Sequence, residues 1–214
     1  MKRIDLMIFD LDGTLAATGK DLVISVNYTL ASLGLETVND DKIISYVGNG
    51  IRNLLIRSLG PDHRNKIEEA LRIFSSYYGD HIMDHTTLYP GVVDCLEHFR
   101  EKKKVVLSNK RKRYVDIILE ALGIMHYFDQ TMGGDSRDYM KPDPRLIEIL
   151  VDQYVSEREK TVIIGDGIND ILLARNAHIL SCAFLGGLTD REVLLGLKPD
   201  DTCETLADMK SLYI

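Results

Sequence analysis

The stretch IDLMIFDLDGT, residues 4–14, decides the fold that we expect for this chain. Its first part, IDLMIF, is short and mostly apolar, which is typical of a buried strand, and it ends abruptly in DLDGT. Just past a strand, residues two apart tend to point the same way, so Asp10 and Asp12 are expected to share one reacting centre. Gly13 lets a ligand approach the backbone closely. The hydroxyl of Thr14 can orient the loop.

Downstream of Tyr89, segments typical of strands alternate with segments typical of helices. Strands are expected at Val105–Leu107, Phe128–Met132, Thr161–Ile164 and Ile179–Phe184, and helices at Val92–Arg100, Tyr114–Leu122, Arg145–Tyr154 and Ile168–Asn176. This alternation predicts an α/β fold with a doubly wound, Rossmann-like parallel sheet. Ligands of such sheets bind beyond the carboxyl ends of the strands.

Between the first strand and Tyr89 the pattern is helical throughout. Apolar residues at helical spacing predict helices over Asp21–Leu33, Ile51–Leu59 and Lys66–Tyr78, and no segment alternates as a strand does. We therefore expect an all-helical cap domain at residues 17–85, inserted into a catalytic core of residues 1–16 and 86–214.

Side chains suited to metal and phosphate chemistry follow the predicted strands or lie in loops beside them. In chain order they are Asp10, Asp12, Ser108, Asn109, Lys110, Lys141, Asp166 and Asp170. Clustered carboxylates repel one another and need a cation, and oxygen ligands without Cys or His favour Mg²⁺. Lys141, Ser108 and the loop amides suit the remaining oxygens of a phosphate.

Composition narrows the class of protein. The chain has 214 residues, 45% of them hydrophobic and 28% charged, as in a globular protein with a sizeable core. A net charge of −7 makes nucleic acid a poor partner. Three widely spaced cysteines without a CxxC motif fit a reducing cytoplasm, and no apolar run is long enough for a membrane span. His81 and His85 predict a solvated helix face rather than a metal site.

With these motifs the chain resembles the haloacid dehalogenase superfamily of phosphatases over essentially its whole length. The matching signatures are DLDGT, Ser108 after the second strand, the lysine of MKPDP and the two acids of GDGIND. Within the superfamily it resembles the phosphoglycolate phosphatase group, through stretches such as YVGNGIR and LYPGV. It departs from relatives at LAATGKDL, where Ala17 cannot supply the polar contact that a Val-Asp-Ser-like stretch offers.

The resemblance implies a role for each motif residue. Asp10 is the nucleophile that forms an aspartyl-phosphate, and Asp12 is the general acid and then the general base. The phosphate-binding residues are Ser108, Asn109, Lys141, Gly13 and Thr14, and the Mg²⁺ ligands are Asp10, Asp12 through its carbonyl, and Asp166, with Asp170 in support. A covalent intermediate splits one hard displacement into two easier steps, which makes these roles chemically sensible.

The expected reaction is hydrolysis of a small-molecule phosphate monoester, with 2-phosphoglycolate as the first candidate. A pyrophosphatase or a sugar phosphatase resembling β-phosphoglucomutase would keep the same motifs. A non-catalytic phospho-acceptor domain would have no use for Asp12 or for a cap. A substrate carboxylate would need a cation, for which Arg52 is the first choice, with Lys20 and Lys110 behind it. The sequence does not define an oligomeric state.

Overall fold

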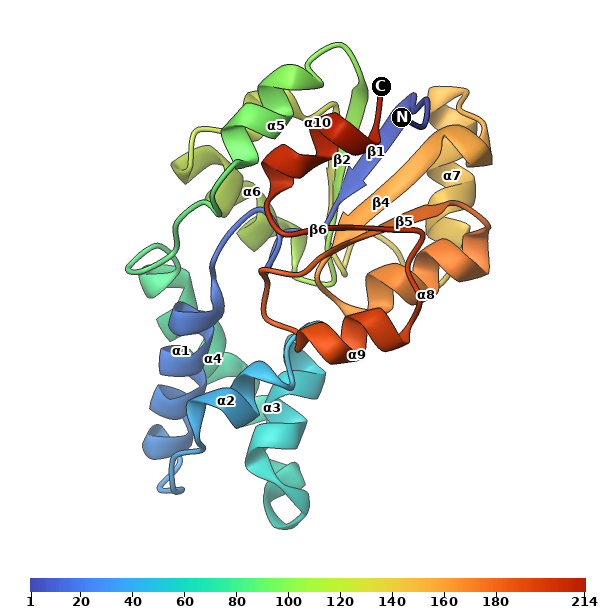
Figure 1. Ribbon diagram of the computed structural model, residues 1–214. Coiled ribbons are helices and arrows are strands. Elements are labelled where there is room, and N and C mark those ends of the chain that lie inside the picture. Colours follow the sequence, from blue (N-terminus) through green and yellow to red (C-terminus); the bar gives the residue numbers. More distant parts are fainter.

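The computed structural model describes residues 1–214 and contains a six-stranded sheet in the order β3-β2-β1-β4-β5-β6 (Figure 1). Its strands are β1 (Leu6–Phe9), β2 (Lys103–Leu107), β3 (Gln130–Met132), β4 (Thr161–Gly165), β5 (Leu180–Phe184) and β6 (Asp201–Cys203). All neighbouring strands are parallel, and Phe9 lies opposite both Val106 and Ile164. The carboxyl end of β1 therefore lies at the middle of one rim, between the ends of β2 and β4.

Helices cover both faces of the sheet, as a doubly wound fold requires (Figure 1). Met7 and Phe9 of β1 belong to one buried cluster, and Leu6 and Ile8 belong to the other. The first face is covered by α5 (Val92–His98), α6 (Lys112–Ala121) and α10 (Met209–Leu212), and the second by α7 (Arg145–Tyr154) and α8 (Ile168–Ala177). Strands that are buried on both faces explain why IDLMIF is apolar at consecutive positions.

The helical insert stands beside the carboxyl ends of the strands (Figure 1). It consists of α1 (Gly19–Ser32), α2 (Asp40–Ile44), α3 (Gly50–Leu59), the 3-10 helix η1 (Pro61–Lys66) and α4 (Ile67–His81). Helix α1 packs against α4, and Val26, Leu55 and Phe74 belong to the same buried cluster as the first face of the sheet. The cap and the core thus share one continuous apolar interior.

The two connections between sheet and cap run side by side. Ala16 and Leu88 form an antiparallel bridge, and the N–H of Ala17 donates to the carbonyl of Thr87 at 2.8 Å. The buried carboxylate of Asp21, in the first turn of α1, accepts from the N–H of His85 at 3.0 Å and from the hydroxyl of Thr86 at 2.8 Å. These hydrogen bonds fix the position at which the cap leaves the core.

The expected helix face with His81 and His85 is wrong. Helix α4 ends at His81, whose Nδ1 lies 2.8 Å from a carboxylate oxygen of Asp84. His85 lies beyond the helix, and its Nδ1 is 2.8 Å from Asp21. The two imidazoles therefore contact different carboxylates, those of Asp84 and Asp21.

The sequence predicted every strand except β6, and the helices α5, α6, α7 and α8 beside the sheet, but not α10. The short elements α2, β6 and α9 (Arg191–Gly196) were not expected. None of the helices combines the length with the apolar character that a membrane crossing requires.

Candidate active site

Asp10 lies at the centre of the rim, directly after β1. Its backbone N–H still donates to the carbonyl of Ile164 at 2.9 Å, so the sheet fixes the residue's position. One carboxylate oxygen, Oδ1, accepts from the N–H of Leu11 at 2.7 Å and lies 2.9 Å from the Nζ of Lys141. The side chain lines the cavity described below, so the carboxylate is both positioned and accessible to a ligand.

Lys141 is a buried cation shared by two acids. Its Nζ lies 2.9 Å from Asp10 and 2.7 Å from Asp170. Burial alone would lower the pKa of Lys141, but the charges of the two carboxylates raise it above its ordinary value. The amide of Asn109 holds the lysine's backbone, since its Oδ1 accepts from the N–H at 2.9 Å and its Nδ2 donates to the carbonyl at 3.0 Å.

Asp166 is fixed behind Asp10 by a separate set of contacts. Its Oδ1 accepts from the hydroxyl of Thr14 at 2.7 Å, and its Oδ2 accepts from the N–H of Leu188 at 2.8 Å. Gly13 has a positive φ of 84°, and a Cβ there would lie 2.2 Å from the carboxylate, so any other residue would displace Asp166. Burial, together with the nearby charge of Asp10, raises the pKa of Asp166 to about 7.

These contacts place Thr14 and Gly13 against Asp166, and the expected role of the two residues in phosphate binding stays a prediction. Thr14 is fully buried and its hydroxyl is engaged with Asp166, and neither residue lines the cavity. The side-chain amide of Asn109 is likewise occupied by backbone groups, so only its backbone N–H remains for a phosphate. Ser108, which is buried at the cavity wall, keeps the expected position.

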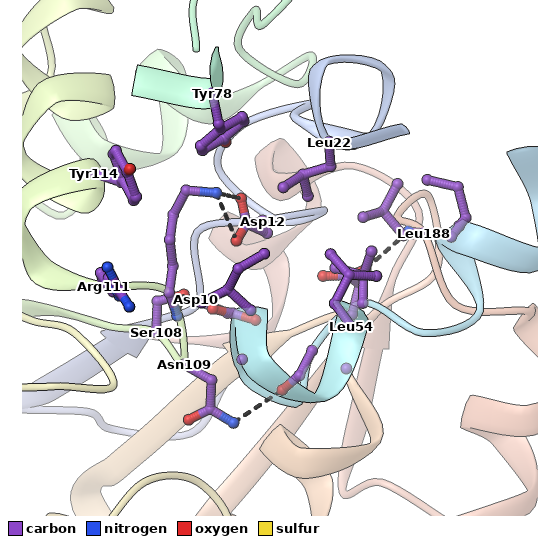
Figure 2. A pocket seen from close by; sticks show the side chains of 18 of the residues that line it. Asp10, Asp12, Leu22, Leu54, Tyr78, Ser108, Asn109, Arg111, Tyr114 and Leu188 are labelled. Carbon is purple, nitrogen blue, oxygen red and sulfur yellow. Dashed lines mark hydrogen bonds and ion pairs between the residues drawn. The ribbon is translucent and has the colours of Figure 1, made fainter. Parts of the chain in front are cut away.

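Asp12 has surroundings quite different from those of Asp10. Its Oδ1 accepts from the hydroxyl of Thr18 at 2.6 Å and from the Nζ of Lys110 at 2.9 Å. The dashed lines at Asp12 in Figure 2 mark the contacts with Lys110. Burial lowers the pKa of Lys110, and the charge of Asp12 raises it, with a net rise above the ordinary value. Thr18 is not among the site residues predicted from the sequence, although it directly follows Ala17, the position at which relatives have a polar contact.

The residues at the rim fit a hard cation such as Mg²⁺. Asp10, Asp166 and Asp170 are three buried carboxylates that offer oxygen ligands, and only two of them, Asp10 and Asp170, are paired with the ammonium group of Lys141. No three side chains of His, Cys, Asp or Glu form a ready-made metal cluster.

A cavity between core and cap opens onto these residues (Figure 2). The core contributes polar side chains, including those of Asp10, Asp12, Ser108, Lys110 and Arg111. The cap contributes Leu22, Ile44, Val47, Gly48, Gly50, Ile51, Leu54, Phe74 and Tyr78. A ligand here would touch charged groups on one side and a mainly apolar wall on the other.

Two of the three expected leaving-group cations lie elsewhere, which corrects that expectation. Arg52 is exposed and donates to Glu68 of α4 at 2.7 Å, outside the cavity lining. Lys20 lines a separate groove with His85 and does not reach the cavity. Lys110 is in place beside Asp12, and Arg111 and Tyr78 join it at the wall without having been singled out from the sequence.

Comparison with known proteins identifies a single family. The model of the haloacid dehalogenase-like hydrolases matches residues 7–184. A phosphoglycolate phosphatase of Haemophilus influenzae (strain 86-028NP) is 34% identical over 191 residues, which are 85% of this chain and 84% of the relative. One from Vibrio cholerae is 31% identical over 225 residues, covering 100% and 99% of the two chains.

Solved structures agree in fold over the full length. A crystal structure from Haemophilus somnus 129pt, described as that of a predicted phosphoglycolate phosphatase, has a TM-score of 0.92 at 27% identity and covers 99% of each chain. A haloacid dehalogenase-like family hydrolase from Streptococcus pneumoniae has a TM-score of 0.88 at 25% identity, with 98% of each chain covered.

Proposed function

The chain belongs to the haloacid dehalogenase-like hydrolases, and on that basis we propose that it is a Mg²⁺-dependent phosphatase acting on 2-phosphoglycolate. One observation carries the proposal. Asp10 and Asp12 both line the cavity, but Asp10 is paired with Lys141 while Asp12 is held by Thr18 and Lys110. Two carboxylates with separate partners suit separate tasks, attack and proton transfer.

In the first step, Asp10 attacks the phosphorus of the substrate. The bond from its carboxylate oxygen to phosphorus forms, and the bond from phosphorus to the leaving oxygen breaks. Asp12 donates its proton to that oxygen, so glycolate leaves as the alcohol. Lys141 and Ser108 hold the phosphoryl oxygens and balance their charge.

In the second step, water attacks the phosphorus of the aspartyl-phosphate. Asp12, now a carboxylate, accepts a proton from the water, and the bond between phosphorus and Asp10 breaks. Inorganic phosphate leaves and Asp10 regains its free carboxylate. Asp12 is again protonated, as the next cycle needs.

A magnesium ion would be held by Asp10, Asp166 and the carbonyl of Asp12, with Asp170 beside them, and it supplies positive charge to the phosphoryl group in transfer. Asp166 is suited to this position because Thr14 and Leu188 fix both of its oxygens.

The substrate is proposed from the relatives and from the shape of the site. Curated relatives from Haemophilus influenzae and Vibrio cholerae carry the name phosphoglycolate phosphatase. The cap closes over the cavity, which favours a small molecule over a phosphoprotein. We also propose that the enzyme acts in the cytoplasm.

A panel of phosphates tests the proposal. With Mg²⁺ present, we expect phosphate release from 2-phosphoglycolate with a kcat/KM above that for hexose phosphates, phosphoserine, mononucleotides and pyrophosphate. A faster reaction with pyrophosphate or a hexose phosphate would contradict 2-phosphoglycolate as the substrate and would identify that compound in its place. Absence of release from every compound, p-nitrophenyl phosphate included, would contradict the phosphatase itself.

A further inference from the structure

The hydroxyl of Tyr78 is an unpaired polar group in the interior. Tyr78 lies on α4, its side chain is 1% exposed, and its Oη is the one buried side-chain nitrogen or oxygen without a hydrogen-bond partner. A buried hydroxyl without a partner destabilises a fold, so such a group is retained where something else satisfies it. The residue lines the cavity, which makes a bound ligand the natural partner (Figure 2).

The ring of Tyr78 is fixed on three sides. It stacks on Phe74 with 5.1 Å between ring centroids and meets the edge of Tyr114 at 5.2 Å. The Nζ of Lys110 lies 4.8 Å from the ring centroid while it holds Asp12. The hydroxyl is therefore held next to the charged pair Lys110–Asp12.

Tyr78 is also distinctive among the residues of the cavity. The other cap residues that line it are Leu, Ile, Val, Phe or Gly, so Tyr78 alone offers a polar side chain from the cap. Tyr114, the other tyrosine of the wall, already donates to the carbonyl of Ser75 at 3.1 Å. Burial raises the pKa of Tyr78 to about 12, so its hydroxyl stays protonated and able to donate at neutral pH.

We propose that Tyr78 is the residue of the cap that recognises the leaving group, by donating a hydrogen bond to its carboxylate. This rests on the proposed function, in which Asp12 protonates the leaving oxygen. In phosphoglycolate a single carbon separates that oxygen from the carboxylate, so the carboxylate reaches the neighbours of Asp12. Lys110 and Arg111 line the same wall and supply the positive charge that Arg52 does not.

The test is the variant Tyr78→Phe, which lacks only the hydroxyl and keeps the ring contacts. We expect kcat/KM for 2-phosphoglycolate to fall about tenfold to hundredfold, the usual effect of losing a hydrogen bond to a charged group. Hydrolysis of p-nitrophenyl phosphate, which has no carboxylate, should fall much less than that of 2-phosphoglycolate. Glycolate, tested as a competitive inhibitor, should bind more weakly to the variant.

The matched control is Tyr77→Phe, on the same helix. Tyr77 stacks between Tyr28 and His81 and does not line the cavity, so both substrates should react as in the wild type. If Tyr78→Phe slows 2-phosphoglycolate and p-nitrophenyl phosphate equally, or slows neither, Tyr78 does not bind the carboxylate of the leaving group and the inference is overturned. If the wild type hydrolyses p-nitrophenyl phosphate but does not prefer 2-phosphoglycolate over the other phosphates of the panel, the proposed substrate is wrong. This result comes from the wild type alone, so it is distinguishable from a failure of the inference about Tyr78.

Discussion

At the scale of single residues, Asp10 and Asp12 show how one motif provides two kinds of carboxylate. They are two positions apart, but the sheet brings Lys141 to the first, whereas Thr18 and Lys110 hold the second. Each carboxylate thus lies beside its own buried lysine, and Asp12 alone also accepts from a hydroxyl, that of Thr18. The difference arises from neighbours far apart in the sequence.

Replacement Asp12→Asn tests this division of labour. The amide keeps the size of the side chain but cannot donate a proton as the acid does. We expect transfer of phosphate from phosphoglycolate to Asp10 to slow by about 10²- to 10⁴-fold. The same step with p-nitrophenyl phosphate should slow less, because nitrophenolate leaves without protonation. Single-turnover bursts measure this step, and equal slowing of both substrates would contradict the assignment.

How far the sequence predicts the site depends on the origin of each residue. Asp10, Ser108 and Asp166 follow strands, and the rule that parallel strands end at one rim placed them together correctly. Arg52 was chosen because it follows a glycine turn, but its guanidinium reaches Glu68, a contact between two helices that no local pattern reveals. Tyr78 looked like one more apolar position of an amphipathic helix.

At the scale of elements, amphipathic helices and apolar strands are predictable from the sequence, whereas the short, partly polar elements α2 and β6 are not. Helix α7 has the predicted bounds, Arg145–Tyr154, because its apolar face repeats over several turns. Helix α2 and strand β6 contain only five and three residues, which is too short for a period to show. Their positions are set by tertiary contacts, such as the pairing of β6 along β5.

The loop Gly48–Gly50 is where the cap touches the core most directly. The carbonyl of Gly48 accepts from the amide of Asn109 at 2.9 Å and from that of Asn169 at 3.0 Å. Asn169 also donates to the side chain of Asn49 at 3.0 Å. The motif GDGIND thus holds the cap through Asn169 as well as supplying Asp166.

Replacement Asn169→Ala removes two of these contacts and leaves every charge in place. We expect KM to rise about threefold to tenfold, since a neutral hydrogen bond contributes roughly 0.5–1.5 kcal/mol. Both phosphoglycolate and p-nitrophenyl phosphate should be affected alike, because the cap closes over either. Steady-state kinetics measure this, with the exposed Asn65→Ala as control. An effect confined to phosphoglycolate would contradict a role in docking the cap.

At the scale of the whole molecule, the sheet holds the chemical groups and the cap encloses them. The motif residues all lie in segments 1–16 and 86–214, while the apolar wall of the cavity comes from the insert. We propose residues 17–85 as the cap domain on this division. The residues that carry out the reaction and those that select the substrate can then change independently.

Removal of metal tests the electrostatics of the whole rim. Asp10 and Asp170 share one lysine and the buried Asp166 has no cationic partner, so a divalent cation should be required for turnover. We expect EDTA to abolish phosphate release and Mg²⁺ to restore it. Ca²⁺ should inhibit, because its looser coordination can engage both oxygens of Asp10. Full activity after exhaustive chelation would contradict a metal at this site.

The central claim is that phosphate passes through Asp10, and a rapid-quench experiment with radiolabelled phosphoglycolate tests it most directly. In the wild type, acid quenching within the first turnover should trap label on the protein, in the peptide that contains Asp10. The variant Asp10→Asn should fold normally, carry no label and release no phosphate. Turnover by Asp10→Asn, or wild-type turnover without protein-bound label, would contradict the account.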